Sequence, residues 1–156
     1  IMRDDRNIPL REELSLVDSY LYIFSVRFED AYDVSCEIDP KTENILIPNL
    51  TVQPVVENAV KHGVDKLRDK SAKRLIRLTA RREGGDLRFT VYNTGSVIQP
   101  QVLRSVFVEK TQGYGLRNVD ERIRLLFGEA YGIRIEGTED GTLCVITIPQ
   151  RREEDL

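Results

Sequence analysis

The spacing of hydrophobic residues divides the chain into helical and strand-like segments. Apolar positions recur about every 3.6 residues in three stretches, which are predicted to be helices: 10–30, 50–63 and 113–128. Apolar and polar residues alternate in five further stretches, which are predicted to be strands: 34–38, 74–83, 86–93, 132–138 and 142–148.

Turn residues group four of these strands into two hairpins. Gly84-Gly85 separates one pair and Asp140-Gly141 separates the other. Helices and hairpins in this order predict an α+β fold, with helices on one face of a mixed, mostly antiparallel sheet. A short helix is also expected near 99–106.

The helix predicted at 50–63 has one polar and one apolar face. Glu57, Asn58, Lys61 and His62 fall on one arc, and valines fill the opposite side. This pattern fits a site that needs a carboxylate, an amide and positive charge together. It also fits an ordinary surface helix with a Glu57–Lys61 pair at i,i+4.

The segment 113–128, GYGLRNVDERIRLLFG, begins with a glycine-rich turn and continues as an amphipathic helix. Gly113 and Gly115 allow the backbone to pass close to a ligand, and the start of a helix suits an anion such as phosphate. Glycine is equally common at plain turns, so this motif alone leaves both interpretations open.

Together, and in this order, the two segments resemble the N box and the G2 box of the catalytic domain of sensor histidine kinases. This domain is part of the gyrase, heat-shock-protein-90, histidine kinase and MutL ATPase superfamily. LRFTVYNTG at 87–95 stands where that domain has its G1 box, and EDGTLCVITIP at 139–149 resembles its last turn and strand. Residues 10–30 resemble the subgroup typified by LytS and YesM. The resemblance implies the two-layer α/β sandwich of the Bergerat ATP-binding fold.

The resemblance also implies a role for each motif residue. Asn58 is expected to be the Mg²⁺ ligand, and Glu57 to accept a proton from the attacking group or to orient it. Lys61 and His62 are expected near the phosphates of ATP. The G2 residues Gly113, Gly115 and Leu116 are expected to wrap the triphosphate, and residues 96–112 correspond to a lid over the nucleotide.

The G1 region departs from the family pattern. Asn93 replaces the usual aspartate, Gly95 is kept, and Val97 replaces the second glycine. Asn93 keeps an acceptor for the adenine amino group but lacks the charge that makes such a hydrogen bond stronger. Thr142 matches a threonine that supports the adenine pocket in the family. Threonine is also common in β-strands, so Thr142 could equally be an ordinary strand residue.

Composition narrows the range of functions. The 156 residues suffice for one core, and the net charge of −3 argues against a nucleic-acid binder. Cys36 and Cys144 are far apart, which favours neither a disulfide framework nor a metal cluster and suits a reducing cytoplasm. No stretch approaches the roughly 18 apolar residues of a membrane span. The resemblance therefore implies a cytoplasmic domain whose parent protein is anchored in the membrane through another segment.

We therefore expect three parts: a linker helix at 1–30, an ATP-binding catalytic domain at 31–150 and a frayed acidic tail at 151–156. The only histidine, His62, lies in the expected nucleotide site. A kinase of this family would thus phosphorylate a histidine on a helical segment outside this chain. Its expected partners are that segment, a response regulator and a second copy of the parent protein.

Two alternatives remain open at this point. A serine kinase or an ATPase of the same superfamily would share the fold and act on another acceptor. A degenerate module that binds nucleotide weakly or only docks is motivated by the altered G1 box.

Overall fold

The computed structural model describes residues 6–27, 32–62, 74–95 and 114–151. The helices in these ranges are α1 (Leu10–Arg27), α2 (Gln53–His62) and α4 (Tyr114–Phe127), with a single 3-10 turn, η1, at Pro40–Thr42. The strands are β1 (Asn7–Pro9), β2 (Asp33–Ile38), β3 (Leu46–Pro48), β4 (Leu75–Glu83), β5 (Asp86–Thr94), β6 (Gly132–Gly137) and β7 (Gly141–Pro149).

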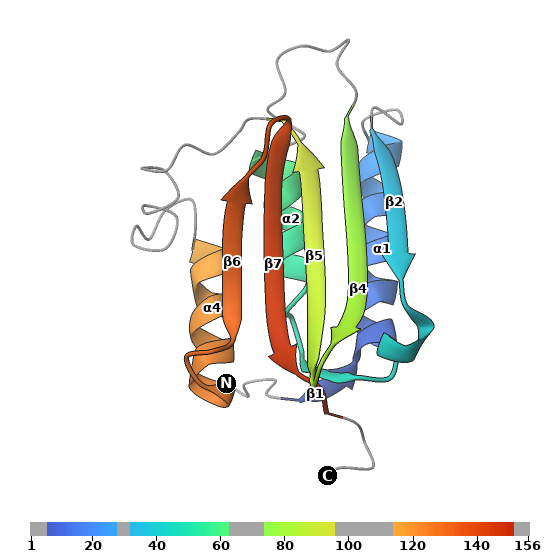
Figure 1. The fold of residues 1–156 in the computed structure, drawn as a ribbon. Coiled ribbons are helices and arrows are strands. Elements are labelled where there is room, and N and C mark those ends of the chain that lie inside the picture. The colour runs from blue at the N-terminus through green and yellow to red at the C-terminus, as the bar shows by residue number, and fades with distance from the viewer. Residues whose placement is uncertain (1–5, 28–31, 63–73, 96–113, 152–156) are drawn as a thin grey trace, which may run out of the picture.

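The main sheet has the strand order β2-β4-β5-β7-β6 (Figure 1). β2 runs parallel to β4, and the other neighbours are antiparallel. Both predicted hairpins are present, and the β4–β5 turn uses Gly84 at φ 63°, a backbone conformation that glycine adopts without strain. The prediction of a mixed, mostly antiparallel sheet is confirmed.

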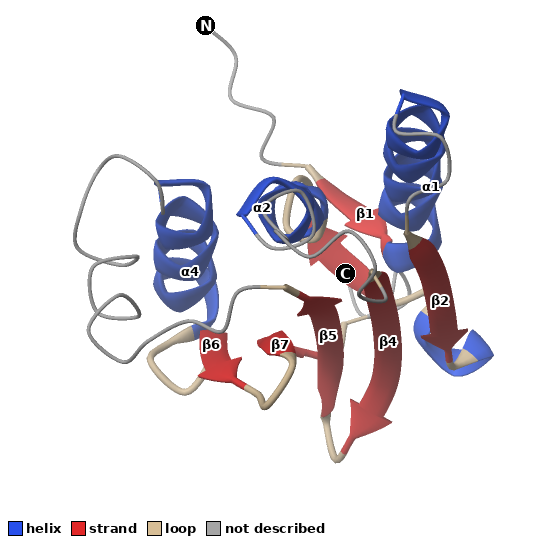
Figure 2. Ribbon diagram, turned by 90° about the horizontal axis from the view of Figure 1, so that it is seen from above, coloured by secondary structure: helices blue, strands red, loops and turns tan. Residues whose placement is uncertain are grey.

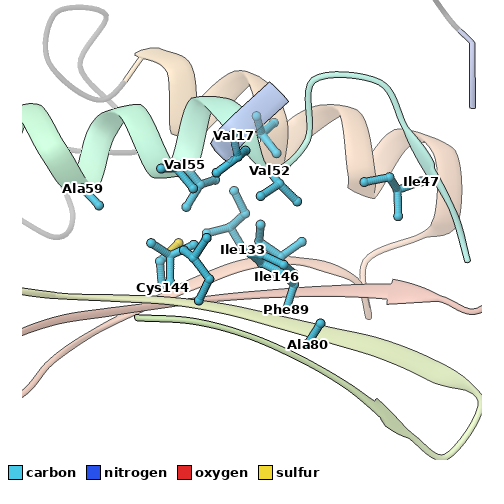
Figure 3. Close-up of a cluster of buried hydrophobic side chains, with 14 of the residues drawn as sticks. Val17, Ile47, Val52, Val55, Ala59, Ala80, Phe89, Ile133, Cys144 and Ile146 are labelled. Carbon is cyan, nitrogen blue, oxygen red and sulfur yellow. The ribbon is translucent and has the colours of Figure 1, made fainter. Parts of the chain in front are cut away.

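The three helices cover one face of this sheet, so the described residues form two layers (Figure 2). The strands turn alternate residues towards the helices, and Figure 3 shows Phe89, Cys144 and Ile146 of the sheet below Val52 and Val55. α1 contributes Val17 and other apolar residues to the same core. The α+β layout expected from the order of elements is therefore correct.

One local prediction was wrong, and one pair of strands was missed. α2 begins at Gln53 and not at residue 50 as predicted, because Leu50 adopts φ 60° and so interrupts any helix there. The short strands β1 and β3 pair with each other, with Ile8 opposite Ile47, and were not predicted. Three residues are too few to show an alternating pattern.

The lid predicted at 96–112, with its short helix at 99–106, lies outside the described residues. No helix among the described residues combines the length and the apolar content needed to cross a bilayer.

Candidate functional site

A small cavity lies between α2, α4 and the sheet, near the end of β5 and the start of β7. Four of the predicted site residues line it: Asn58, Asn93, Leu116 and Thr142. They come from four elements that are distant in sequence, α2, β5, α4 and β7, and the fold brings them together. The cavity has a volume of about 20 Å³, room for a single water molecule, so a larger ligand must displace part of its lining.

The polar side chains of the sheet stand opposite each other on neighbouring strands. Asn93 of β5 pairs in register with Thr142 of β7, and both are almost fully buried, at 5% and 8% exposure. The Asn93 side-chain nitrogen donates a hydrogen bond to the carbonyl oxygen of Thr94 at 3.2 Å. This bond leaves the Asn93 carbonyl oxygen as the atom suited to accept from a ligand.

Gly141 allows β5 and β7 to close tightly beside this pair. A Cβ atom at Gly141 would lie 1.9 Å from the carbonyl oxygen of Asn93, so no other residue fits without movement of the backbone. Gly95 has φ 137°, and its N–H donates to the carbonyl oxygen of Asp140 at 3.1 Å. The predicted G1 glycine thus helps join the two strand ends, which is a structural use beside its expected contact with nucleotide.

The remaining walls of the cavity are apolar. They consist of Val55 and Ala59 from α2, Leu116 from α4, and Val91, Ile135 and Cys144 from the sheet. Burial, helped by the charge of Asp120, raises the pKa of the Cys144 thiol to about 12. This cysteine is therefore protonated at neutral pH and acts as an apolar wall. Apolar walls with a few polar groups are typical of pockets for small molecules.

Glu57 and Lys61 lie on α2 outside the lining of this cavity. Glu57 accepts a hydrogen bond from the side chain of Gln53 at 3.2 Å, and Lys61 is exposed. Among the residues that the structure describes, Glu57 and Lys61 form no ion pair, so the surface-pair alternative is not observed. Both side chains remain available for the roles that the resemblance implies.

The other predicted site residues are placed only in part. His62 ends α2, and its side chain is outside the described part of the structure, as is Gly113. Gly115 lies in the first turn of α4, where an added Cβ would meet nothing within 4 Å. Packing within the described residues therefore does not require glycine at 115, and its expected contact with phosphate stays a prediction.

Comparison with known families decides the identity of the domain. The model of the family described as histidine kinase-, DNA gyrase B-, and HSP90-like ATPase matches residues 46–152. The chain belongs to this ATPase family. The match includes α2, the cavity and the whole of the β5–β7 region, and the predicted family is confirmed.

Curated relatives of this ATPase domain are sensor histidine kinases. YesM of Bacillus subtilis is 37% identical over 147 residues, which cover 94% of this chain and 24% of YesM. YpdA of Escherichia coli is 35% identical over 153 residues, which cover 97% of this chain and 26% of YpdA. The chain therefore spans about a quarter of the length of these relatives.

Solved structures share the fold. The catalytic domain of the histidine kinase ThkA superposes with a TM-score of 0.69 at 20% identity, covering 95% of this chain and 98% of that domain. The histidine kinase domain of EL346 from Erythrobacter litoralis gives 0.66 at 21% identity, covering 96% and 65%. The predicted α+β fold class is confirmed.

The sequence analysis missed two charged residues that bind the start of this ATPase domain's α2 and the loop before it. Glu13 of α1 is fully buried, and Arg122 of α4 donates hydrogen bonds to the loop that precedes α2. One sign was available in the sequence, because Glu13 occupies the apolar stripe of α1, between Leu10 and Val17. A carboxylate at a core position usually has a specific partner.

Proposed function

We propose that this chain binds ATP with Mg²⁺ and transfers the terminal phosphoryl group to a histidine outside the chain, as the catalytic domain of a two-component sensor histidine kinase. The observation that carries the proposal is the cavity itself. Its lining joins Asn58 of α2 with Asn93 and Thr142 of the sheet.

The chemical groups that line the cavity suit an adenine base. An aromatic base needs apolar surfaces on its faces and hydrogen-bonding groups at its edge, and the lining supplies both. We propose that the Asn93 carbonyl oxygen accepts a hydrogen bond from the adenine amino group, with Thr142 beside it. Because Asn93 is uncharged, we expect weaker affinity than an aspartate would give.

The residues near the cavity also fit a magnesium ion shared with phosphate. The Asn58 side-chain oxygen is a hard ligand on a helix, of the kind that Mg²⁺ accepts. Among the described residues, no group of three or more His, Cys, Asp and Glu side chains gathers as a metal site. We therefore propose that Asn58 and the substrate phosphates together would hold the metal, which when bound would offset the negative charge of the phosphates.

We assign the remaining chemistry to α2 and to the start of α4. Glu57 would accept the proton of the attacking imidazole or orient that group, while Lys61 and His62 would offset charge on the phosphates. Gly113, Gly115 and Leu116 would approach the nucleotide through the backbone and one apolar side chain.

The partners of this proposed kinase follow from its relatives. ThkA has been solved in complex with the response regulator protein TrrA, and we propose a response regulator as the downstream partner here. We also propose a parent protein that is a homodimer, carries the phosphoacceptor helix and is anchored in the cell membrane, with this domain in the cytoplasm.

The second candidate function is a module that binds nucleotide weakly or not at all and acts by docking. The uncharged Asn93 in the base position and the small volume of the cavity favour it. A serine kinase or an ATPase would share the fold and the cavity and would act on a different acceptor.

Calorimetric titration with a non-hydrolysable magnesium–ATP analogue tests nucleotide binding. We expect saturable binding that Asn58→Ala abolishes. Asn44→Ala, which changes an exposed asparagine that does not line the cavity, should leave affinity unchanged. Absence of binding to the wild-type chain at millimolar ligand would favour the docking module.

Phosphoryl transfer is tested by incubating the chain with radiolabelled ATP and a phosphoacceptor segment from the parent protein. A phosphohistidine is labile in acid and stable in base, and this is the expected result. Label that survives acid would favour the serine kinase, and release of inorganic phosphate without labelled protein would favour the ATPase.

A further inference from the structure

Glu13 places a buried carboxylate against the N-terminal end of α2. The side chain is 0% exposed, and Oε1 accepts a hydrogen bond from the backbone N–H of Gln53, the first residue of α2, at 3.4 Å. Oε2 is buried and has no hydrogen-bond partner among the residues that the structure describes. A negative charge at this end of a helix is favourable, because the free N–H groups and the helix dipole are positive there.

The sequence next to α2 supplies no side chain for this purpose. Val52, directly before the helix, has no acceptor. The hydroxyl of Thr51 is engaged elsewhere, since it donates to the carbonyl oxygen of Pro48 at 2.6 Å and accepts from Nη2 of Arg122 at 3.2 Å. The acceptor for α2 therefore comes from α1, 40 residues away along the chain.

Arg122 links α4 to the loop that precedes α2. Its Nη2 donates to the carbonyl oxygen of Leu50 at 2.8 Å and to the hydroxyl of Thr51 at 3.2 Å. Desolvation raises the pKa of Glu13, while the N–H groups at the start of α2 and the positive charge of Arg122 oppose that rise. Leu50 itself is held at φ 60°, which is costly for a residue other than glycine.

We propose that Glu13 is a positioning residue for the nucleotide site, through which α1 controls the placement of α2 and α4. Its carboxylate holds the end of the helix that carries Asn58 and Glu57, and Arg122 brings the helix that carries Leu116 to the same junction. The inference rests on the proposed function, because it assigns regulation to the same nucleotide site.

The use of a buried carboxylate at Glu13 supports a positioning role over a role in stabilising α2 alone. A serine or asparagine at position 52 would cap α2 without the cost of burying a carboxylate. A cap that belongs to α1 makes the position of α2 depend on whether α1 is docked. Movement of α1 thus changes the distance between Asn58 and the sheet, and hence the affinity for nucleotide.

The test compares Glu13→Gln with Glu12→Gln in the full chain. Glu12 precedes Glu13 on the same helix but is exposed, so it is a matched control for loss of one charge on α1. The dissociation constant for the magnesium–ATP analogue is measured by calorimetry well below each unfolding transition, with and without the stabilising osmolyte trimethylamine N-oxide.

We expect Glu13→Gln to weaken nucleotide binding at least fivefold, and Glu12→Gln to change it less than twofold. The weakening should persist in the osmolyte, because restoring global stability does not restore the lost charge at the start of α2. Wild-type affinity in a folded Glu13→Gln variant, or full rescue by the osmolyte, would show that Glu13 is only structural and would overturn the inference.

Arg122→Gln keeps the test decisive if Glu13→Gln does not fold. This variant changes the same junction from a partly exposed position, and we again expect at least fivefold weaker binding. Unchanged affinity would overturn the inference. If the wild-type chain does not bind nucleotide, the proposed function is wrong. If the wild-type chain binds and the Glu13 and Arg122 variants bind equally well, the proposed function stands and only this inference is wrong.

Discussion

At the scale of single residues, the site depends on close approach between β5 and β7. Asn93 and Thr142 face each other because Gly141, the neighbour of Thr142, lets the strands meet without a side chain between them. The Asn93 amide and the Thr142 hydroxyl could form hydrogen bonds anywhere on the sheet. They lie side by side on the cavity wall because Gly141 lets the two strands approach.

Gly141→Ala should therefore damage both the fold and the site. The new methyl group would overlap the carbonyl oxygen of Asn93, and relief of such an overlap typically costs about 1–3 kcal/mol of unfolding free energy. Urea unfolding measures this loss. Gly85→Ala is the control, since a Cβ at Gly85 meets nothing within 4 Å, and equal stability of the two variants would contradict the argument.

At the scale of elements, α2 is too short to be stable by itself. It has 10 residues, and isolated helices below about 12–15 residues are marginal in water. Its stability comes from Val55 and Val56 in the core, and its start is held by Glu13 of α1. The helix that presents the motif residues is thus defined by its neighbours.

Replacing Glu13 should also change how stability depends on pH. Desolvation raises the pKa of Glu13 above its ordinary value of 4.5, so the folded chain holds this proton more tightly than the unfolded chain. The wild type then loses stability as pH rises from about 4.5 through the raised pKa, by about 1.4 kcal/mol for each unit of the rise.

Glu13→Gln lacks this titration. The unfolding free energy of the variant minus that of the wild type should therefore increase with pH across this window. Urea unfolding of both proteins at several pH values measures the difference, with Glu12→Gln as the control. A difference that stays flat or decreases would contradict the raised pKa of Glu13.

At the scale of the whole molecule, the cavity lies between the two layers. Its lining comes from α2 and α4 on one side and from β5, β6 and β7 on the other, and Figure 2 shows these helices above the sheet. A ligand bound in the cavity would therefore contact both layers at once. Unfolding must separate these layers. A ligand that binds only the folded form therefore stabilises the entire domain.

Magnesium–ATP analogue at 100 times its dissociation constant should stabilise the chain by about 2.7 kcal/mol. Scanning calorimetry would record a higher unfolding temperature, and addition of a chelator should remove most of the shift because Asn58 is proposed to act through the metal. An equal shift in the presence of chelator would contradict the assigned role of Asn58. Asn58→Ala should show little shift under either condition.

Features that depend on neighbours along the chain could be predicted from the sequence. The periodicity of α1, α2 and α4 and the turn residues Gly84 and Gly141 act over a few residues, and these three predicted helices and both predicted hairpins are present. The residue types of the N box, G1 and G2 motifs also indicated the family, because each motif is a short run of adjacent residues.

Features that depend on distant segments were decided by the tertiary structure. The start of α2 at Gln53, the pairing of β1 with β3 and the burial of Glu13 each involve partners far away in the sequence. A local pattern can suggest that a residue such as Glu13 has a partner, but it does not identify that partner. The sequence thus determined the helices, the hairpins and the chemical groups of the site. Packing of the helices on the sheet decided which of those groups share one cavity and which charge holds the helix that carries Asn58.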